Sequence, residues 1–134
     1  MLDNLTRNDL SAEGSRWLIS YLTAIDNRDI SAYGTFLADT CSLRMNYIPV
    51  MQGKDNVLMM LGSIWSSLAG MRHDPLMILG DDYEFALEAI HHYDLKSGKK
   101  TPIPATEFIS RNAEGLVTRI RIYCNADPAF SEEN

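Results

Sequence analysis

This chain has no cluster of basic residues. Its 134 residues include 12 lysines and arginines against 18 aspartates and glutamates, which gives a net charge of −6. Because proteins that bind the phosphate backbone need a basic surface, this composition argues against a nucleic-acid partner. No apolar run approaches the roughly 20 residues that span a bilayer, and residues 1–9 are too polar for a signal peptide. We therefore expect a cytoplasmic protein that contacts no membrane.

Cysteine is scarce, and the common metal and cofactor motifs are missing. Cys41 and Cys124 are the only cysteines, and without an export signal we expect both to be reduced thiols. Neither C-x-x-C nor H-x-x-x-H occurs, so we predict no metal site. The sequence also lacks G-x-S-x-G, a P-loop and G-x-G-x-x-G, which argues against the nucleophile and nucleotide chemistry of those motifs. We expect no cofactor.

The first half of the chain has helical periodicity. Ser11 is a plausible N-cap, and Trp17, Tyr21 and Ile25 then recur at a spacing that buries one helix face. Asp29 is placed to cap a short second helix. A third helix is predicted from residue 55 to residue 68, with Gly70 at its C-terminal stop. Between the second and third helices, residues 41–47 alternate as a half-buried strand, whose inward residues would be Cys41, Leu43, Met45 and Tyr47.

The second half of the chain has the period-two pattern of strands. We predict strands over residues 71–79, 83–95, 103–110 and 116–124, separated by short polar turns. The pair Asp74-Pro75 interrupts the first of these strands, which predicts an edge position or a bulge.

Helices followed by a run of strands are typical of an α+β fold. We expect one domain over residues 1–134, in which a curved antiparallel sheet wraps around the long N-terminal helix and forms a cone with two further helices. Such a cone encloses a pocket. Residues 1–10 and 126–134 are polar, and we expect both ends to be flexible.

Glu107 is the strongest candidate for a functional side chain. It shares a strand face with Ile103, Ala105 and Ile109, and desolvation there would raise the pKa of its carboxyl unless a cation or hydrogen-bond donors reach it. A protonated carboxyl in an apolar pocket can donate a hydrogen bond to a developing oxyanion. Two other interpretations stay open. In one, the opposite face of the strand is the buried one; in the other, Glu107 forms a structural salt bridge with an arginine of the last strand.

Tyr21 and the histidines are further candidates. Tyr21 lies on the buried face of the first helix, where its hydroxyl needs a partner and could serve a ligand oxygen or simply the core. His73 could move a proton, because histidine titrates near neutrality, or it could be a satisfied structural residue. His91 and His92 are adjacent in a strand, so their side chains leave opposite faces and at most one points inward.

Soft apolar side chains are numerous, including seven methionines. Such side chains adapt to flat apolar ligands, although they are more often ordinary core. The candidates for lining a ligand pocket are Trp17, Met45, Tyr47 and Trp65.

Three segments carry a resemblance to a known family. They are residues 21–41, which include Tyr21-Leu-Thr-Ala-Ile-Asp-Asn-Arg-Asp-Ile30, then Gln52-Gly-Lys-Asp55, and finally Gly115-Leu-Val-Thr-Arg-Ile-Arg-Ile-Tyr123. In these segments the chain resembles the nuclear-transport-factor-two-like (NTF2-like) superfamily, which includes ketosteroid isomerases and SnoaL-like polyketide cyclases. The resemblance implies a cone-shaped α+β domain with an apolar cavity, and a homodimer formed through the outer sheet face.

The resemblance also bears on the site. It places the oxyanion-binding pair of the ketosteroid isomerases on Tyr21 and Glu107, but it places their catalytic carboxylate on Met45, which cannot accept a proton. His73 could supply a base from another strand, as histidine does in related dehydratases. In the limonene-epoxide-hydrolase branch, Asn46 matches loosely, whereas the final aspartate of the catalytic set would fall on Ile122.

Together these observations predict a SnoaL-like domain whose pocket takes a small, apolar, oxygen-bearing molecule. As an enzyme, it would be a cofactor-free isomerase, dehydratase or cyclase that uses Tyr21, Glu107 and His73. The alternative is a non-catalytic ligand-binding or assembly domain of the same fold.

Overall fold

The computed structural model describes residues 1–130. It contains four helices and six strands in an α+β arrangement within those residues. In chain order the elements are α1 (Ala12–Asp26), α2 (Ile30–Gly34), β1 (Leu37–Met45), β2 (Met51–Gln52), α3 (Lys54–Ser66), β3 (Leu68–Gly80), β4 (Glu84–Leu95), β5 (Lys100–Arg111), β6 (Val117–Cys124) and α4 (Asp127–Phe130).

The strands form one sheet in the order β2-β1-β6-β5-β4-β3. All neighbouring strands are antiparallel, as expected, except β1 and β6, which run parallel and make the sheet mixed. The parallel pair joins the first strand to the last. No local sequence pattern encodes the direction of a pairing between strands so far apart along the chain.

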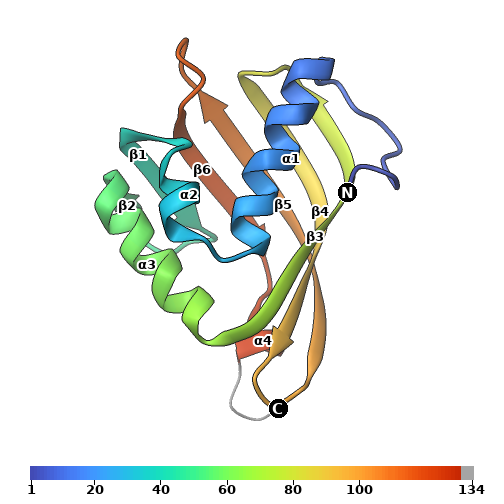
Figure 1. The fold of residues 1–134 in the computed structure, drawn as a ribbon, viewed down its shortest axis with the longest axis vertical. Helices are drawn as coiled ribbons and strands as arrows, with labels where there is room; N and C mark the ends of the chain where they lie inside the picture. Colours follow the sequence, from blue (N-terminus) through green and yellow to red (C-terminus); the bar gives the residue numbers. More distant parts are fainter. Residues whose placement is uncertain (131–134) are drawn as a thin grey trace.

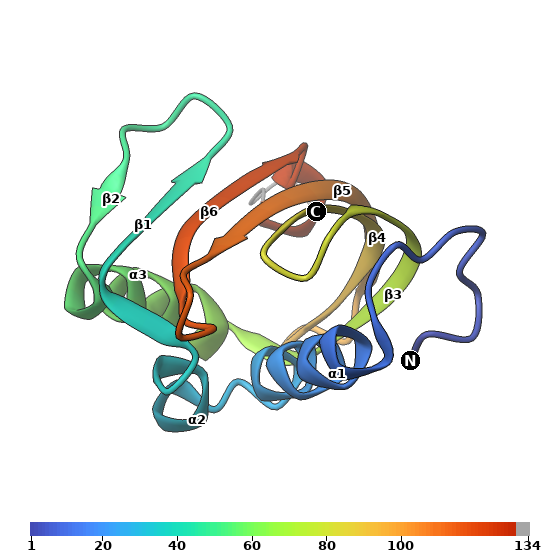
Figure 2. The ribbon, with the colours of Figure 1, turned by 90° about the horizontal axis from the view of Figure 1, so that it is seen from above.

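The sheet curves, and α1, α2 and α3 lie on its inner side (Figures 1 and 2). The predicted caps are present, since the side chain of Ser11 accepts from the N–H of Gly14 and that of Asp29 accepts from the N–H of Ala32. The core lies between the helices and the concave face of the sheet. It includes Leu18, Tyr21, Leu22, Tyr33, Val57, Ile78, Leu87, Ile109 and Ile120, all of which are buried.

Several element boundaries differ from the prediction. The third helix ends at Ser66 and β3 begins at Leu68, so Gly70 lies inside a strand and does not stop the helix. Strand β1 begins at Leu37 and ends at Met45. It ends there because Asn46 adopts a left-handed conformation, with φ of 54°, so Tyr47 falls in the following turn.

Strand β3 shows the predicted irregularity. It is an edge strand of the sheet, and its register with β4 shifts between Pro75 and Met77. Proline cannot donate to the ladder, which explains both the edge position and the bulge.

The N-terminal arm lies along β3. The N–H of Thr6 donates to the carbonyl of Leu76 at 2.9 Å, and the N–H of Ile78 donates to the carbonyl of Arg7 at 2.9 Å. At the other end of the chain, α4 occupies residues 127–130, and residues 131–134 of the tail predicted to be flexible lie outside the described residues. Among residues 1–130, no helix is both long and apolar enough to cross a membrane.

Candidate active site

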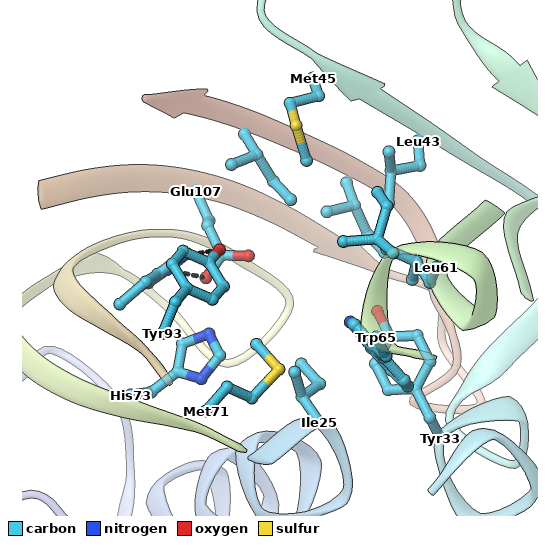
Figure 3. Close-up of a pocket in the computed structure, with 14 residues that line it drawn as sticks. Ile25, Tyr33, Leu43, Met45, Leu61, Trp65, Met71, His73, Tyr93 and Glu107 are labelled. Atoms are coloured by element: carbon cyan, nitrogen blue, oxygen red, sulfur yellow. Dashed lines mark hydrogen bonds and ion pairs between the residues drawn. The ribbon is translucent and has the colours of Figure 1, made fainter. Parts of the chain in front are cut away.

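A cavity of about 50 Å³ lies between the helices and the concave face of the sheet (Figure 3). It adjoins an outer chamber of about 370 Å³, and the two spaces share five lining residues, Met45, Ile64, His91, Tyr93 and Ile122. The inner cavity is lined by Ile25, Tyr33, Leu43, Met45, Leu61, Ile64, Trp65, Met71, His73, His91, Tyr93, Glu107, Ile120 and Ile122. Most of this lining is apolar, and in Figure 3 His73, Tyr93 and Glu107 gather on one side of it.

The first polar pair in this cavity joins helix α1 to strand β3. Asp26, the last residue of α1, accepts a 2.6 Å hydrogen bond from Nδ1 of His73 on one carboxylate oxygen. Its other oxygen accepts from the backbone N–H of His73 at 3.1 Å. When the ring is neutral, an imidazole that donates through Nδ1 presents Nε2 as an acceptor, so the contact with Asp26 selects the tautomer of His73 that suits a general base.

The second polar pair joins strands β4 and β5. Nε2 of His91 lies 3.5 Å from a carboxylate oxygen of Glu107, and both side chains are about 95% buried. The inward-facing pair between them along the sheet is Ala89 and Ala105, which are register partners. Because two methyl groups fill little space, the longer His91 and Glu107 side chains can meet above them.

Sheet register also brings the two pairs together. His73 and His91 are direct cross-strand partners, and their ring centroids lie 4.3 Å apart. Residues opposite each other on one face of an antiparallel pair are in side-chain contact. Two imidazoles, each paired with a carboxylate, therefore meet at one wall of the cavity.

The histidines decide the charge of Glu107. Burial raises the pKa of this carboxyl, but the contact with His91 and the charges of His91 and His73 together hold the pKa below its ordinary value of 4.5. Glu107 is therefore a carboxylate near neutral pH, and the protonated donor suggested from the sequence is not favoured. The carboxylate instead offers an acceptor oxygen 3.5 Å from Nε2 of His91.

The surroundings of Glu107 decide whether its strand face is buried and whether it forms a salt bridge with an arginine of the last strand. Glu107 is 3% exposed, so its strand face is the buried one. On the outer face, the guanidinium of Arg121 lies 4.9 Å from the ring centroid of Phe108, which turns this arginine away from the cavity.

Tyr21 lies behind the cavity wall. Its hydroxyl is 2.7 Å from that of Tyr33, and Tyr33 is the tyrosine that lines the cavity from the helical side. Burial raises the pKa of both phenols above the ordinary value of 10, with the charge of Glu107 as a smaller contribution, so both stay protonated and can donate.

The predicted lining residues divide into two groups. Met45 and Trp65 line the cavity. Trp17 is not among the lining residues; its ring stacks on Tyr21 with centroids 4.9 Å apart, and the guanidinium of Arg111 covers it at 3.9 Å. Tyr47 is 89% exposed in the turn after β1, away from the cavity.

Sequence reasoning missed Asp26, Tyr33 and the inward direction of His91. The sequence indicated only that Asp26 ends the first helix. Its contact with His73 could not be predicted, because the two residues are 47 positions apart and no local pattern links them. One sequence pattern did indicate the direction of His91. His92 shares a strand face with the charged Asp94, as period two requires, so His91 lies on the opposite face, which is the inward one.

Comparisons with known proteins bear on the fold. No protein-family model matches the chain, and no curated protein matches it in sequence. Solved structures do match. A proposed SnoaL-like polyketide cyclase from Shewanella denitrificans superposes with a TM-score of 0.76 at 9% identity, covering 87% of this chain and 93% of that one.

Two other structures extend this similarity. An epoxide hydrolase of Mycobacterium tuberculosis resembling limonene epoxide hydrolase has a TM-score of 0.72 at 16% identity, covering 87% of this chain and 85% of its own. A hypothetical protein of Catenulispora acidiphila with a ketosteroid isomerase-like fold has a TM-score of 0.69 at 14% identity, covering 79% and 82%. At these identities the likeness concerns the fold, because one such fold hosts many activities. The chain has the α+β fold of the NTF2-like superfamily, to which the SnoaL-like and ketosteroid isomerase-like proteins belong.

Proposed function

We propose that this protein is a cofactor-independent enzyme that moves protons on a small, apolar, oxygen-bearing molecule. The reaction class is isomerisation, dehydration or cyclisation. The observation that carries the proposal is the meeting of two imidazole–carboxylate pairs, His73–Asp26 and His91–Glu107, with rings 4.3 Å apart at the wall of an apolar cavity.

The two pairs suit opposite roles in proton transfer. His73 is held by Asp26 with Nε2 as acceptor, and it takes a proton from a carbon next to an oxygen-bearing centre. The electron pair of that C–H bond forms a C=C bond, and the charge that develops on oxygen is neutralised by a proton from His91. The Glu107 carboxylate, 3.5 Å from Nε2 of His91, would support this acid role by its negative charge. Tyr33 can add a hydrogen bond to the ligand from the helical wall.

The shape of the cavity limits the substrate. An inner cavity of about 50 Å³ holds only a small group, whereas the outer chamber of about 370 Å³ falls in the range of roughly 300–1,000 Å³ common for small-molecule sites. The reacting, oxygen-bearing end of the substrate would therefore enter the inner cavity, and the apolar body would remain in the outer chamber.

The chemistry named for structural neighbours is compatible with this proposal. One neighbour, SalBIII, is described as an epoxide hydrolase/cyclase-like enzyme with a role in pyran ring formation, and it superposes with a TM-score of 0.73 at 12% identity over 84% of this chain. Ring formation of that kind requires a base and an acid at the reacting centre, which the two histidine pairs would provide here from one wall of the cavity.

Deuterium exchange tests the proposal before the natural substrate is known. Cyclic ketones and β-hydroxy ketones are incubated with the protein in D₂O, in buffer containing a chelator, and exchange at carbon is followed by mass spectrometry. We expect exchange that falls by about 10²- to 10⁴-fold in His73→Asn, the usual contribution of a general base. The matched control is His92→Asn, which makes the same substitution at a histidine on the outer face of the sheet, next to His91 in the sequence. Equal exchange by His73→Asn and the wild type would refute the role of His73.

The alternative function is ligand binding without reaction. The outer chamber supports it, because this space is mostly apolar and large enough to hold a ligand, and His91 is the only member of the two histidine pairs among its lining residues. A ketone that binds stoichiometrically but shows no exchange, in the wild type and in His73→Asn alike, would favour a binding domain.

A further inference from the structure

Three side chains of the cavity converge as metal ligands do. One ring nitrogen of His73, one of His91 and one carboxylate oxygen of Glu107 all lie within 4.8 Å of one another, and all three residues are buried. They come from the adjacent strands β3, β4 and β5, so the rigid part of the sheet sets their positions. Two histidines and one carboxylate form a common ligand set for Zn²⁺ and related ions.

Two of the three ligand atoms have no hydrogen-bond partner. Nε2 of His91 and Oε2 of Glu107 are both buried and lie at an ion-pair distance of 3.5 Å, but neither has a hydrogen-bond partner among the described residues. Buried polar atoms are nearly always satisfied, so a pair of unsatisfied atoms facing each other calls for an explanation. Two ligands bound tetrahedrally at 2.0–2.1 Å from Zn²⁺ are separated by about 3.4 Å, which is close to the observed distance.

Both histidines also have outer partners. Nδ1 of His73 is bonded to Asp26 at 2.6 Å, and Nδ1 of His91 lies 3.3 Å from the hydroxyl of Tyr93. Each ring therefore has Nε2 available toward the cavity. This is how metal-binding histidines are held, with the second nitrogen bonded to a carboxylate or another polar group that sets the tautomer.

From these three observations we propose that His73, His91 and Glu107 bind one divalent transition-metal ion of the Zn²⁺ class, with Asp26 and Tyr93 as positioning residues. The cluster would contract by at most about 1.4 Å at its widest to reach tetrahedral spacing. The fourth position faces the apolar cavity. A metal on Nε2 of His73 removes the lone pair that would accept a proton, so metal binding and the proton transfer proposed above exclude each other, and Zn²⁺ inhibits the enzyme.

Co²⁺ titration of chelator-treated, tag-free protein tests the site by a readout other than activity. We expect one Co²⁺ per chain, with the intense visible absorption of a tetrahedral ion, and displacement of Co²⁺ by Zn²⁺. Affinity should fall at least 10-fold in Glu107→Gln and in His91→Ala, and about 10- to 100-fold in Asp26→Asn, the usual effect of losing an outer partner. His92→Ala is the matched control and should bind as the wild type does. Circular dichroism checks that each variant is folded.

The possible results separate this inference from the proposed function. The absence of Co²⁺ binding, or binding that survives in Glu107→Gln, would overturn the metal site while leaving deuterium exchange in chelator untouched. Exchange in chelator that stops when Zn²⁺ is added supports both proposals. Exchange that occurs only when metal is present would keep the site but overturn cofactor-independent proton transfer and inhibition by Zn²⁺.

Discussion

Among single side chains, the His91–Glu107 pair contributes most to the character of the site. Both groups are buried, so the stability of each depends on the other. Removing one partner of a buried ionic pair leaves an uncompensated charge, whereas replacing both with apolar groups can be nearly neutral. The pair is therefore better understood as a functional device than as a source of stability.

This reasoning predicts unequal effects of single and double substitutions. His91→Leu should lower the free energy of unfolding by about 3–5 kcal/mol, because the Glu107 carboxylate loses its partner. The double variant His91→Leu/Glu107→Leu should recover most of that loss. Chemical denaturation of the wild type, the two single variants and the double variant measures the coupling. Simple additivity of the two single effects would show that the pair does not interact.

Among the secondary-structure elements, two junctions, each a set of side-chain-to-backbone hydrogen bonds, connect elements that are far apart in the sequence. One ties the start of α1 to the turn before β4: Asp82 accepts from the backbone N–H of Ser11 at 2.9 Å and from its hydroxyl at 2.5 Å. A Cβ at position 14 would lie 2.1 Å from an oxygen of Asp82, so this close approach requires glycine there.

The first junction predicts a dependence of stability on pH. The hydrogen bonds from Ser11 lower the pKa of Asp82 below its ordinary value of 3.8. A carboxyl whose pKa is lower in the folded state adds stability above its unfolded pKa and loses that contribution as pH falls through the folded value. Asp82→Ala should therefore reduce Tm at pH 7, and the difference from the wild type should shrink as pH falls below 3.8, the ordinary pKa of this carboxyl. A difference that stays constant with pH would contradict this origin.

The second junction ties the end of β1 to the end of β6. The side chain of Asn46 donates to the carbonyl of Cys124 at 2.7 Å and accepts from the N–H of the same residue at 3.0 Å. Asn46 also adopts a left-handed conformation, which costs other non-glycine residues about 1–2 kcal/mol.

The Asn46 junction predicts a graded series. Asn46→Gly keeps the conformation but loses two hydrogen bonds, and it should lower the free energy of unfolding by about 1–3 kcal/mol. Asn46→Ala adds backbone strain and should cost about 1 kcal/mol more. Urea denaturation ranks the two variants. Equal stability of Asn46→Ala and Asn46→Gly would show that the backbone conformation is not the cause.

For the molecule as a whole, the outer face of the sheet is a surface that the candidate site does not use. It presents Phe108 and Tyr123, whose rings are 6.0 Å apart, and Tyr123 is 41% exposed. Exposed aromatic side chains on a sheet face are typical of interfaces, because they bury much area at low conformational cost.

We therefore predict a homodimer formed through the outer sheet face. Light scattering coupled to size-exclusion chromatography should give twice the mass of the 134-residue chain. Tyr123→Glu should shift the protein toward a monomer, whereas Tyr47→Glu, an exposed tyrosine in the turn after β1, should leave the mass unchanged. A wild-type monomer at micromolar concentration would refute the prediction.

The sequence by itself determined most of the helices and strands. The N-caps at Ser11 and Asp29 and the bulge in β3 follow from short-range patterns, since capping is a local property of the backbone and proline cannot donate to a strand ladder. For the strand of Glu107, side-chain alternation left two faces to choose from, and the structure shows that the face of Glu107 is the buried one. Only the tertiary structure decided the parallel pairing of β1 with β6, and which residues meet.

The site itself belongs to that second category. Asp26 meets His73 across 47 positions, and His91 faces His73 because of the β3–β4 register and Glu107 because of the curvature of the sheet. Because Glu107 shares a strand face with apolar residues, the sequence suggested that its carboxyl is protonated. In the structure, two histidines on neighbouring strands lower the pKa of this carboxyl. The charge of a buried group depends on everything packed around it, and packing between distant segments leaves no trace in the local pattern.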